Sequence, residues 1–196
     1  MNEAEWLACN DPTPMLTQLK GKESDRKFRL LTCELLRRYT DLMGAEGWTL
    51  TPAVPWRAIE LGELWADGKV GDEEILAYCG PTADRLTPLL PRALEAFESC
   101  VEICRYYCTL QIPSSLLCEA FGNPFRPVTF SPEWRTDTAV LLARTMYDAR
   151  EFSAMPILAD ALQDAGCDSD DILAHCRGPG PHVRGCWVVD LVLGKV

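Results

Sequence analysis

The sequence has no apolar run long enough to cross a membrane, which takes about 18 to 20 consecutive apolar residues. Its first fifteen residues, MNEAEWLACNDPTPM, are acidic. They lack the basic start followed by a long apolar core that is typical of a secretory signal peptide. We therefore predict a cytoplasmic protein that has no membrane partner.

Positive charge is also scarce. Nineteen lysines and arginines face 29 aspartates and glutamates, which gives a formal net charge of −10. Such a balance opposes attraction to the phosphate backbone of nucleic acids, which dominates their non-specific binding. We expect no nucleic-acid partner, and we interpret the basic residues between Lys20 and Arg38 as the solvated face of a helix.

Several short motifs that identify enzymes are absent. The sequence contains no phosphate-binding loop, no dinucleotide fingerprint, no HExxH and no GxSxG. The acidic string from Asp164 to Asp171 lacks the glycine and the final glutamate of a calcium loop, so helix capping explains it better. Taken together, these absences favour a protein that is not an enzyme.

Clean strand-type alternation is absent as well, and helical spacing dominates. Helices are predicted at 3–9, 24–43, 56–66, 72–78, 91–110 and 152–165, with shorter ones around them, and a proline-rich irregular piece at 122–132. The sequence thus predicts an all-α protein, a single globular domain over residues 1–196 with about nine helices. Segment 183–193 is nearly all apolar, and its length suits either a buried helix or a buried strand.

Ten cysteines in a reducing compartment are expected to be mostly free thiols, many of them buried. Cys100, Cys104 and Cys108 recur every four residues and share one face of the predicted helix 91–110. Such a row of thiols is able to bind copper(I) or zinc if a facing helix adds sulfur. We favour the simpler interpretation, a stripe of small residues along which helices approach closely.

Only two histidines occur, and both lie in the last 32 residues beside three cysteines. Cysteine and histidine at short spacing, separated by a tight Gly-Pro turn, are typical ligands of a structural zinc ion. The candidate ligands are Cys176, His182 and Cys186, with Cys167 or His175. Because this spacing is not that of a standard zinc finger, two alternatives stay open. The cysteines are core thiols, or Cys186 and His182 form a nucleophilic pair.

Several blocks of the chain resemble a large family of uncharacterised proteins from planctomycete bacteria. The similar blocks are EAEWLACNDPTPML, GKESDRKFRLLTC, AIELGELWADGKVGDEEILA, FGNPFRPV and ILADALQDAGCDSDDILAHCRGPGPHVRGCWVVDLVLGK. The resemblance implies no activity, substrate or site residue. Relatives often carry more cysteines just after RLLTC, where this chain has Glu34, Leu35 and Leu36. This departure counts against a shared metal site on the N-terminal helix and leaves the C-terminal cluster as the candidate.

Three functional hypotheses follow. The first is a non-enzymatic module that binds a protein partner and needs no cofactor. The second is a small zinc-binding structural domain that uses the C-terminal Cys/His cluster. The third is a thiol-dependent enzyme, for which an oxyanion hole is not evident and for which Asp190 alone is available to orient the histidine.

Overall fold

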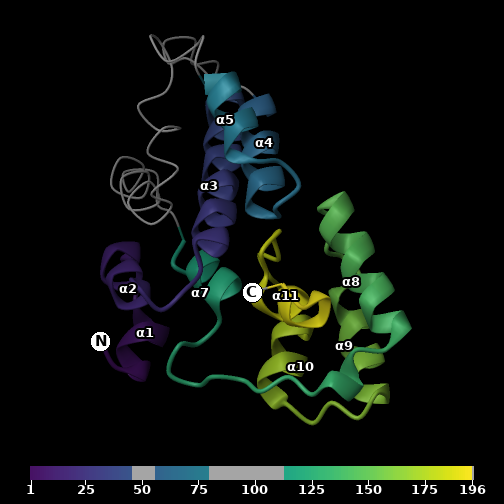
Figure 1. Ribbon diagram of the computed structural model, residues 1–196. Helices are drawn as coiled ribbons and strands as arrows, with labels where there is room; N and C mark the ends of the chain where they lie inside the picture. The colour runs from purple at the N-terminus through teal and green to yellow at the C-terminus, as the bar shows by residue number, and fades with distance from the viewer. Residues whose placement is uncertain (46–55, 80–112, 196) are drawn as a thin grey trace. The chain divides into compact units, whose positions relative to one another are not determined.

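The computed structural model describes residues 1–45, 56–79 and 113–195 (Figure 1). These residues form ten α-helices and one short 3-10 helix, with no strand among them, which confirms the all-α prediction. None of the helices within these ranges has both the length and the apolar character that a membrane span requires. The predicted helix 91–110, with its row of three cysteines, lies outside the described residues.

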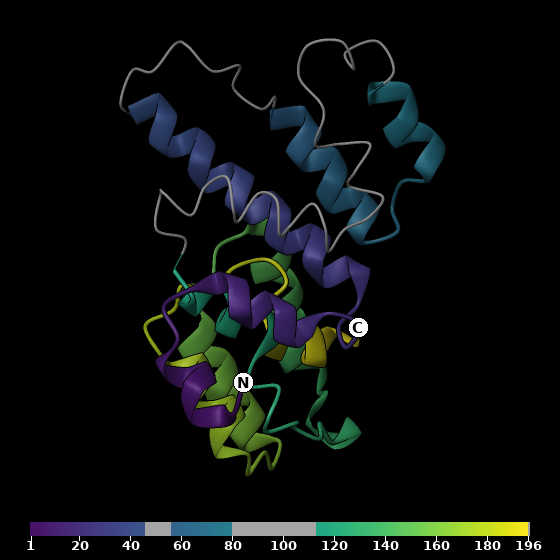
Figure 2. The same cartoon turned by 90° about the vertical axis from the view of Figure 1, so that its left-hand side faces the viewer.

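The chain divides into two compact units, one of Met1–Cys9 with Ser114–Val196 and the other of Asn10–Pro113. That residues 1–196 act as a single domain stays a prediction. The second unit holds α2 (Pro12–Leu19), α3 (Asp25–Ala45), α4 (Trp56–Ala66) and α5 (Asp72–Cys79). Within it, α3 and α4 lie side by side (Figure 2). An ion pair between Arg37 of α3 and Glu63 of α4 joins them, with 2.9 Å between Nε and Oε1.

The first unit holds the remaining helices. These are α1 (Glu3–Ala8), α7 (Ser115–Phe121), the 3-10 helix η3 (Pro132–Trp134), α8 (Asp137–Ala149), α9 (Met155–Asp164), α10 (Asp170–Arg177) and α11 (Trp187–Leu193). Apolar side chains of α8 to α11 form one continuous core, which includes Tyr147, Leu158, Ile172 and Val189. This core fixes α10 and α11, the two helices that flank the candidate site, against each other.

The N-terminal helix α1 is tied to this unit by the segment that follows α7. Asn123 Nδ2 donates to Glu3 Oε1 at 2.8 Å, and the rings of Phe125 and Trp6 pack edge to face, with 6.5 Å between centroids. Residues 122–131 are irregular as predicted, whereas Pro132, the last residue of the predicted piece, begins η3. The side chains of this irregular segment therefore serve as anchors for α1 although the backbone forms no helix there.

Local signals fix the ends of several helices. The side chains of Asp11, Thr136 and Ser169 accept hydrogen bonds from backbone N–H groups in the first turns of α2, α8 and α10, and all three are residue types that N-caps prefer. Gly166 follows α9 with a φ of +88°, a conformation that favours glycine.

Segment 183–193 resolves as a turn followed by helix α11. Val188, Val189 and Val192 are fully buried, so its apolar composition reflects burial within a helix and not a strand. The Arg135 guanidinium donates to the carbonyl oxygens of Leu191 and Val192 at 2.7 and 2.9 Å. These bonds satisfy carbonyls at the end of α11 that have no partner within the helix.

Candidate metal centre

Helix α7 supplies a buried carboxylate. Leu116, Glu119 and Ala120 are spaced so that they share one face of the helix, and each is buried. Only 3% of Glu119 is exposed, among apolar neighbours on its own helix. A carboxylate in such a position requires polar partners from elsewhere, because an unpaired buried charge is strongly destabilising.

Helix α10 turns His175 toward that carboxylate and Cys176 away from it. Cys176 is one turn after Ile172 on the buried face of α10, and both are fully buried in the apolar core. Consecutive helical residues point about 100° apart, so His175 lies at the edge of the core. There its Nε2 atom is 3.3 Å from Glu119 Oε2.

The turn between α10 and α11 returns His182 to the same place. Gly180 has a φ of +83°, and a Cβ atom there would lie 2.7 Å from the backbone nitrogen of His182, so the turn requires glycine. His182 Nδ1 then lies 3.3 and 3.2 Å from the two Glu119 oxygens. The backbone N–H of Val183 also donates to Glu119 Oε1 at 3.3 Å.

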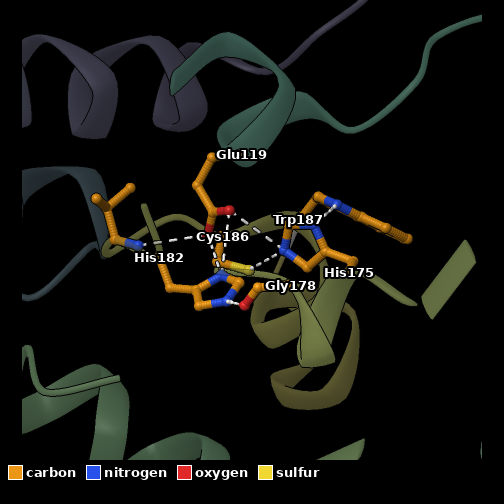
Figure 3. A network of polar contacts seen from close by, with 7 residues as sticks. Glu119, His175, Gly178, His182, Cys186 and Trp187 are labelled. Carbon is orange, nitrogen blue, oxygen red and sulfur yellow. Dashed lines mark hydrogen bonds and ion pairs between the residues drawn. The ribbon is translucent and has the colours of Figure 1, made fainter. Parts of the chain in front are cut away.

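Cys186, which is fully buried directly before α11, completes the group. Its Sγ atom is 3.2 Å from His175 Nε2. One ligand atom from each of Glu119, His175, His182 and Cys186 lies within 4.8 Å of every other (Figure 3). One carboxylate oxygen, two imidazole nitrogens and one sulfur thus converge on a single point within one compact unit.

The partners of each imidazole decide where its protons lie. The Trp187 indole N–H donates to His175 Nδ1 at 3.1 Å, so Nδ1 is an acceptor and Nε2 carries the ring proton. Both nitrogens of His182 face acceptors, Glu119 on one side and the Gly178 carbonyl oxygen at 3.3 Å on the other. His182 is therefore a cation that forms an ion pair with Glu119.

The network shifts the protonation of its members. Burial alone would raise the pKa of the Glu119 carboxyl, but hydrogen bonds from His175, His182 and Cys186 outweigh it and bring the pKa to about 2. The hydrogen bond to Glu119 raises the pKa of His182 against the opposing effect of burial. Glu119 is thus an anion at neutral pH.

Of the five residues predicted from sequence, the structure brings together His175, His182 and Cys186. Cys167 and Cys176 lie in the apolar core, outside this group. Burial raises the pKa of both thiols, that of Cys176 to about 12, and such a thiol stays neutral and behaves as a small apolar side chain.

Sequence reasoning missed Glu119, which lies 56 positions before His175. The one signal for it was a glutamate at a helical position that the spacing of Leu116 and Ala120 places on the buried face.

Comparisons with family models, with curated proteins and with solved structures gave no match for this chain. The resemblance to planctomycete proteins stays a prediction, and the function has to be argued from the site.

Proposed function

We propose that this chain is a zinc-binding protein in which one structural Zn²⁺ is held by Glu119, His175, His182 and Cys186. The observation that supports the proposal is the convergence of four ligand atoms within 4.8 Å of one another. They come from α7, from α10 and from the turn before α11, so a bound ion would tie three separate segments together.

The spacing of the ligand atoms suits a small tetrahedral ion. Zinc bonds of roughly 2.0 to 2.3 Å place the ligand atoms of a tetrahedron about 3.3 to 3.8 Å apart. Three pairs already lie at 3.2 to 3.3 Å, namely His175 with Cys186, His175 with Glu119 and His182 with Glu119. The four atoms all lie within 4.8 Å of one another, so small adjustments of the side chains would bring them to tetrahedral spacing.

Charge and donor type also support zinc. A carboxylate and a thiolate with two neutral imidazoles carry two negative charges, which a divalent cation neutralises inside a buried site. Mixed nitrogen, sulfur and oxygen ligands suit zinc, whereas magnesium and calcium take oxygen ligands alone. His182 is already arranged as a ligand, because its second nitrogen donates to the Gly178 carbonyl oxygen.

Burial favours a structural over a catalytic role. Catalytic zinc sites keep a position open for water or substrate, while structural sites have four protein ligands. Here four ligands are available, Cys186 is fully buried and only 3% of Glu119 is exposed. The site is thus suited to stabilising the fold around it.

The short contact between Cys186 and His175 favours a second candidate, a thiol-dependent enzyme. In such an enzyme the histidine takes the proton of the thiol. His175 Nε2, the atom that faces Cys186, already carries a proton because Nδ1 accepts from Trp187. This pairing and the full burial of Cys186 make the enzyme the weaker proposal. The interaction module stays a prediction, because it requires nothing of this cluster.

The test is the zinc content of purified protein, measured by mass spectrometry after growth with added zinc. We expect about one zinc per chain in the wild type and none in Cys186→Ser or Glu119→Gln. Cys118→Ser is the matched control, because Cys118 precedes Glu119 on the same helix but is not part of the group. It should keep its zinc.

Cobalt(II) titration gives a second readout, because a thiolate ligand to cobalt produces an absorption band that serine does not. The proposal is wrong if the wild type binds neither ion, or if Cys186→Ser binds both as tightly as the wild type.

A further inference from the structure

Trp187 lies against the candidate site between Gly122, at the end of α7, and His175 of α10. On one side is Gly122, which follows α7 with a φ of +68°, and a Cβ atom there would be only 3.2 Å from the indole ring. On the other side is His175, whose ring centroid is 5.1 Å from that of Trp187 (Figure 3). The indole is therefore placed by the same helix that carries Glu119.

The hydrogen bond from Trp187 conflicts with metal binding by His175. A histidine that binds a metal through one nitrogen normally donates a proton from the other to an acceptor. His182 meets this requirement with the Gly178 carbonyl oxygen, but His175 Nδ1 faces an indole N–H, which only donates. If His175 Nε2 bound the metal, Nδ1–H and the indole N–H would point at each other.

We propose that Trp187 is a positioning residue that sets the metal affinity of His175, and that metal binding breaks the Trp187–His175 hydrogen bond. The inference rests on the proposed zinc site and adds a determinant that is not a ligand. Trp187 keeps the proton of His175 on Nε2, the atom that must bind the ion. Each binding event therefore costs one hydrogen bond and moves the side chain of the first residue of α11.

The first test compares cobalt(II) affinity in Trp187→Phe and in the wild type. Phenylalanine keeps an aromatic ring but has no N–H, so the metal-free protein loses the competing bond. We expect cobalt(II) to bind roughly two- to tenfold more tightly, the range that one net hydrogen bond represents. Trp134→Phe is the matched control, because Trp134 packs on Phe130 in the same unit and is not in the group. It should bind like the wild type.

The second test needs no variant. Nitrogen-15 NMR of the imidazoles shows which nitrogen of His175 carries the proton, and we expect Nε2 before zinc is added and Nδ1 afterwards. A proton on Nδ1 after zinc is added requires that the Trp187–His175 hydrogen bond has broken, because Nδ1 then no longer accepts.

The outcomes separate the two proposals. If cobalt(II) binds the wild type but binds Trp187→Phe equally or less tightly, the role of Trp187 is wrong and the metal site stands. The same holds if His175 carries its proton on Nδ1 before metal is added. If neither ion binds the wild type, both proposals are wrong.

Discussion

Glu63 and Glu119 are buried to the same extent, with 3% of each exposed, but their partners differ. Glu63 pairs with the guanidinium of Arg37 across α3 and α4. Glu119 is surrounded by two imidazoles, a thiol and a backbone N–H. Two compact units of one chain thus neutralise the same buried group with different chemistry.

The difference determines what each site is able to bind. A guanidinium stays protonated at any ordinary pH and offers no lone pair, so the Arg37–Glu63 pair has one state. Imidazole and thiol release their protons and then bind metals. The group around Glu119 therefore has two states, a hydrogen-bonded one with protons and a coordinated one with a cation. Burial of a carboxylate alone therefore does not indicate a metal site. The residues that contact the carboxylate decide whether it is able to bind a cation.

Removal of the metal should reveal the largest difference between the two glutamates, because only the group around Glu119 would lose stability with it. Zinc present at about 1,000 times its Kd adds about 4 kcal/mol to the free energy of unfolding. A strong chelator should therefore lower the Tm of the zinc-loaded wild type by about 8 to 16 °C. Thermal melts followed by circular dichroism measure this shift. Glu119→Gln, which we expect to bind no zinc, should melt at the same temperature with and without chelator. A zinc-loaded wild type that is insensitive to chelator would contradict the structural role.

Breaking the Arg37–Glu63 ion pair should destabilise the protein without changing its zinc content. Glu63→Gln leaves the largely buried Arg37 guanidinium without its counter-charge, which costs about 3 kcal/mol. Urea denaturation measures the loss, and zinc content should stay at about one per chain. Glu34→Gln is the matched control, since Glu34 pairs with the more exposed Arg38 one turn away on α3. Its cost should be below about 0.5 kcal/mol. If Glu63→Gln and Glu34→Gln lowered the free energy of unfolding equally, burial would not be the reason why the Arg37–Glu63 pair matters.

The sequence predicted what depends on neighbours along the chain. The caps Asp11, Thr136 and Ser169 and the helix-ending Gly166 act through residues two to four positions away, so residue type and place along the chain are enough to predict such features. The choice between helix and strand for 183–193 depended on what covers each face, and composition alone left it open.

The site was predicted in part for the same reason. His175, His182 and Cys186 lie within twelve positions, and short spacing around a Gly-Pro turn drew attention to them. Glu119 reaches them only through packing of α7 against α11, which no local pattern encodes. The sequence did indicate that Cys176 is buried in the core, because Ile172 lies four positions earlier and both residues fall on the buried face of α10.

Acidity should distinguish the two pairs by the pH range in which each contributes. The pKa of Glu119 falls from 4.5 to about 2 on folding, so its stabilisation is complete above pH 4.5 and is lost as the pH falls toward 2. The pKa of His182 is raised above 6.5, so its contribution is present below pH 6.5 and is lost as the pH rises through the higher folded value. Without metal, the contacts of Glu119 with His175, His182 and Cys186 should together contribute most between pH 4.5 and 6.5, up to about 3 kcal/mol.

Melts of chelator-treated wild type and His182→Asn measure this window between about pH 2 and 9, the range in which carboxylates and imidazoles titrate. The difference between the two proteins should be largest inside the window and shrink on both sides. The difference between wild type and Glu63→Gln should not fall from pH 5 to 9, because arginine does not titrate there. A wild-type and His182→Asn difference that is constant with pH would argue against the His182–Glu119 ion pair.

A smaller effect should come from Cys176→Ser, and it tests which face of α10 meets the site. Cys176 is fully buried among apolar side chains, where a hydroxyl costs about 1–2 kcal/mol in the free energy of unfolding. Zinc content should stay unchanged, whereas Cys186→Ser should lose zinc. If Cys176→Ser instead lost zinc while His175→Asn kept it, the ligand spacing would be Cys-x5-His-x3-Cys. Helix α10 would then be rotated by about 100° from the arrangement described. Urea denaturation and zinc analysis of these three variants therefore decide whether His175 or Cys176 is the residue of α10 that faces the site.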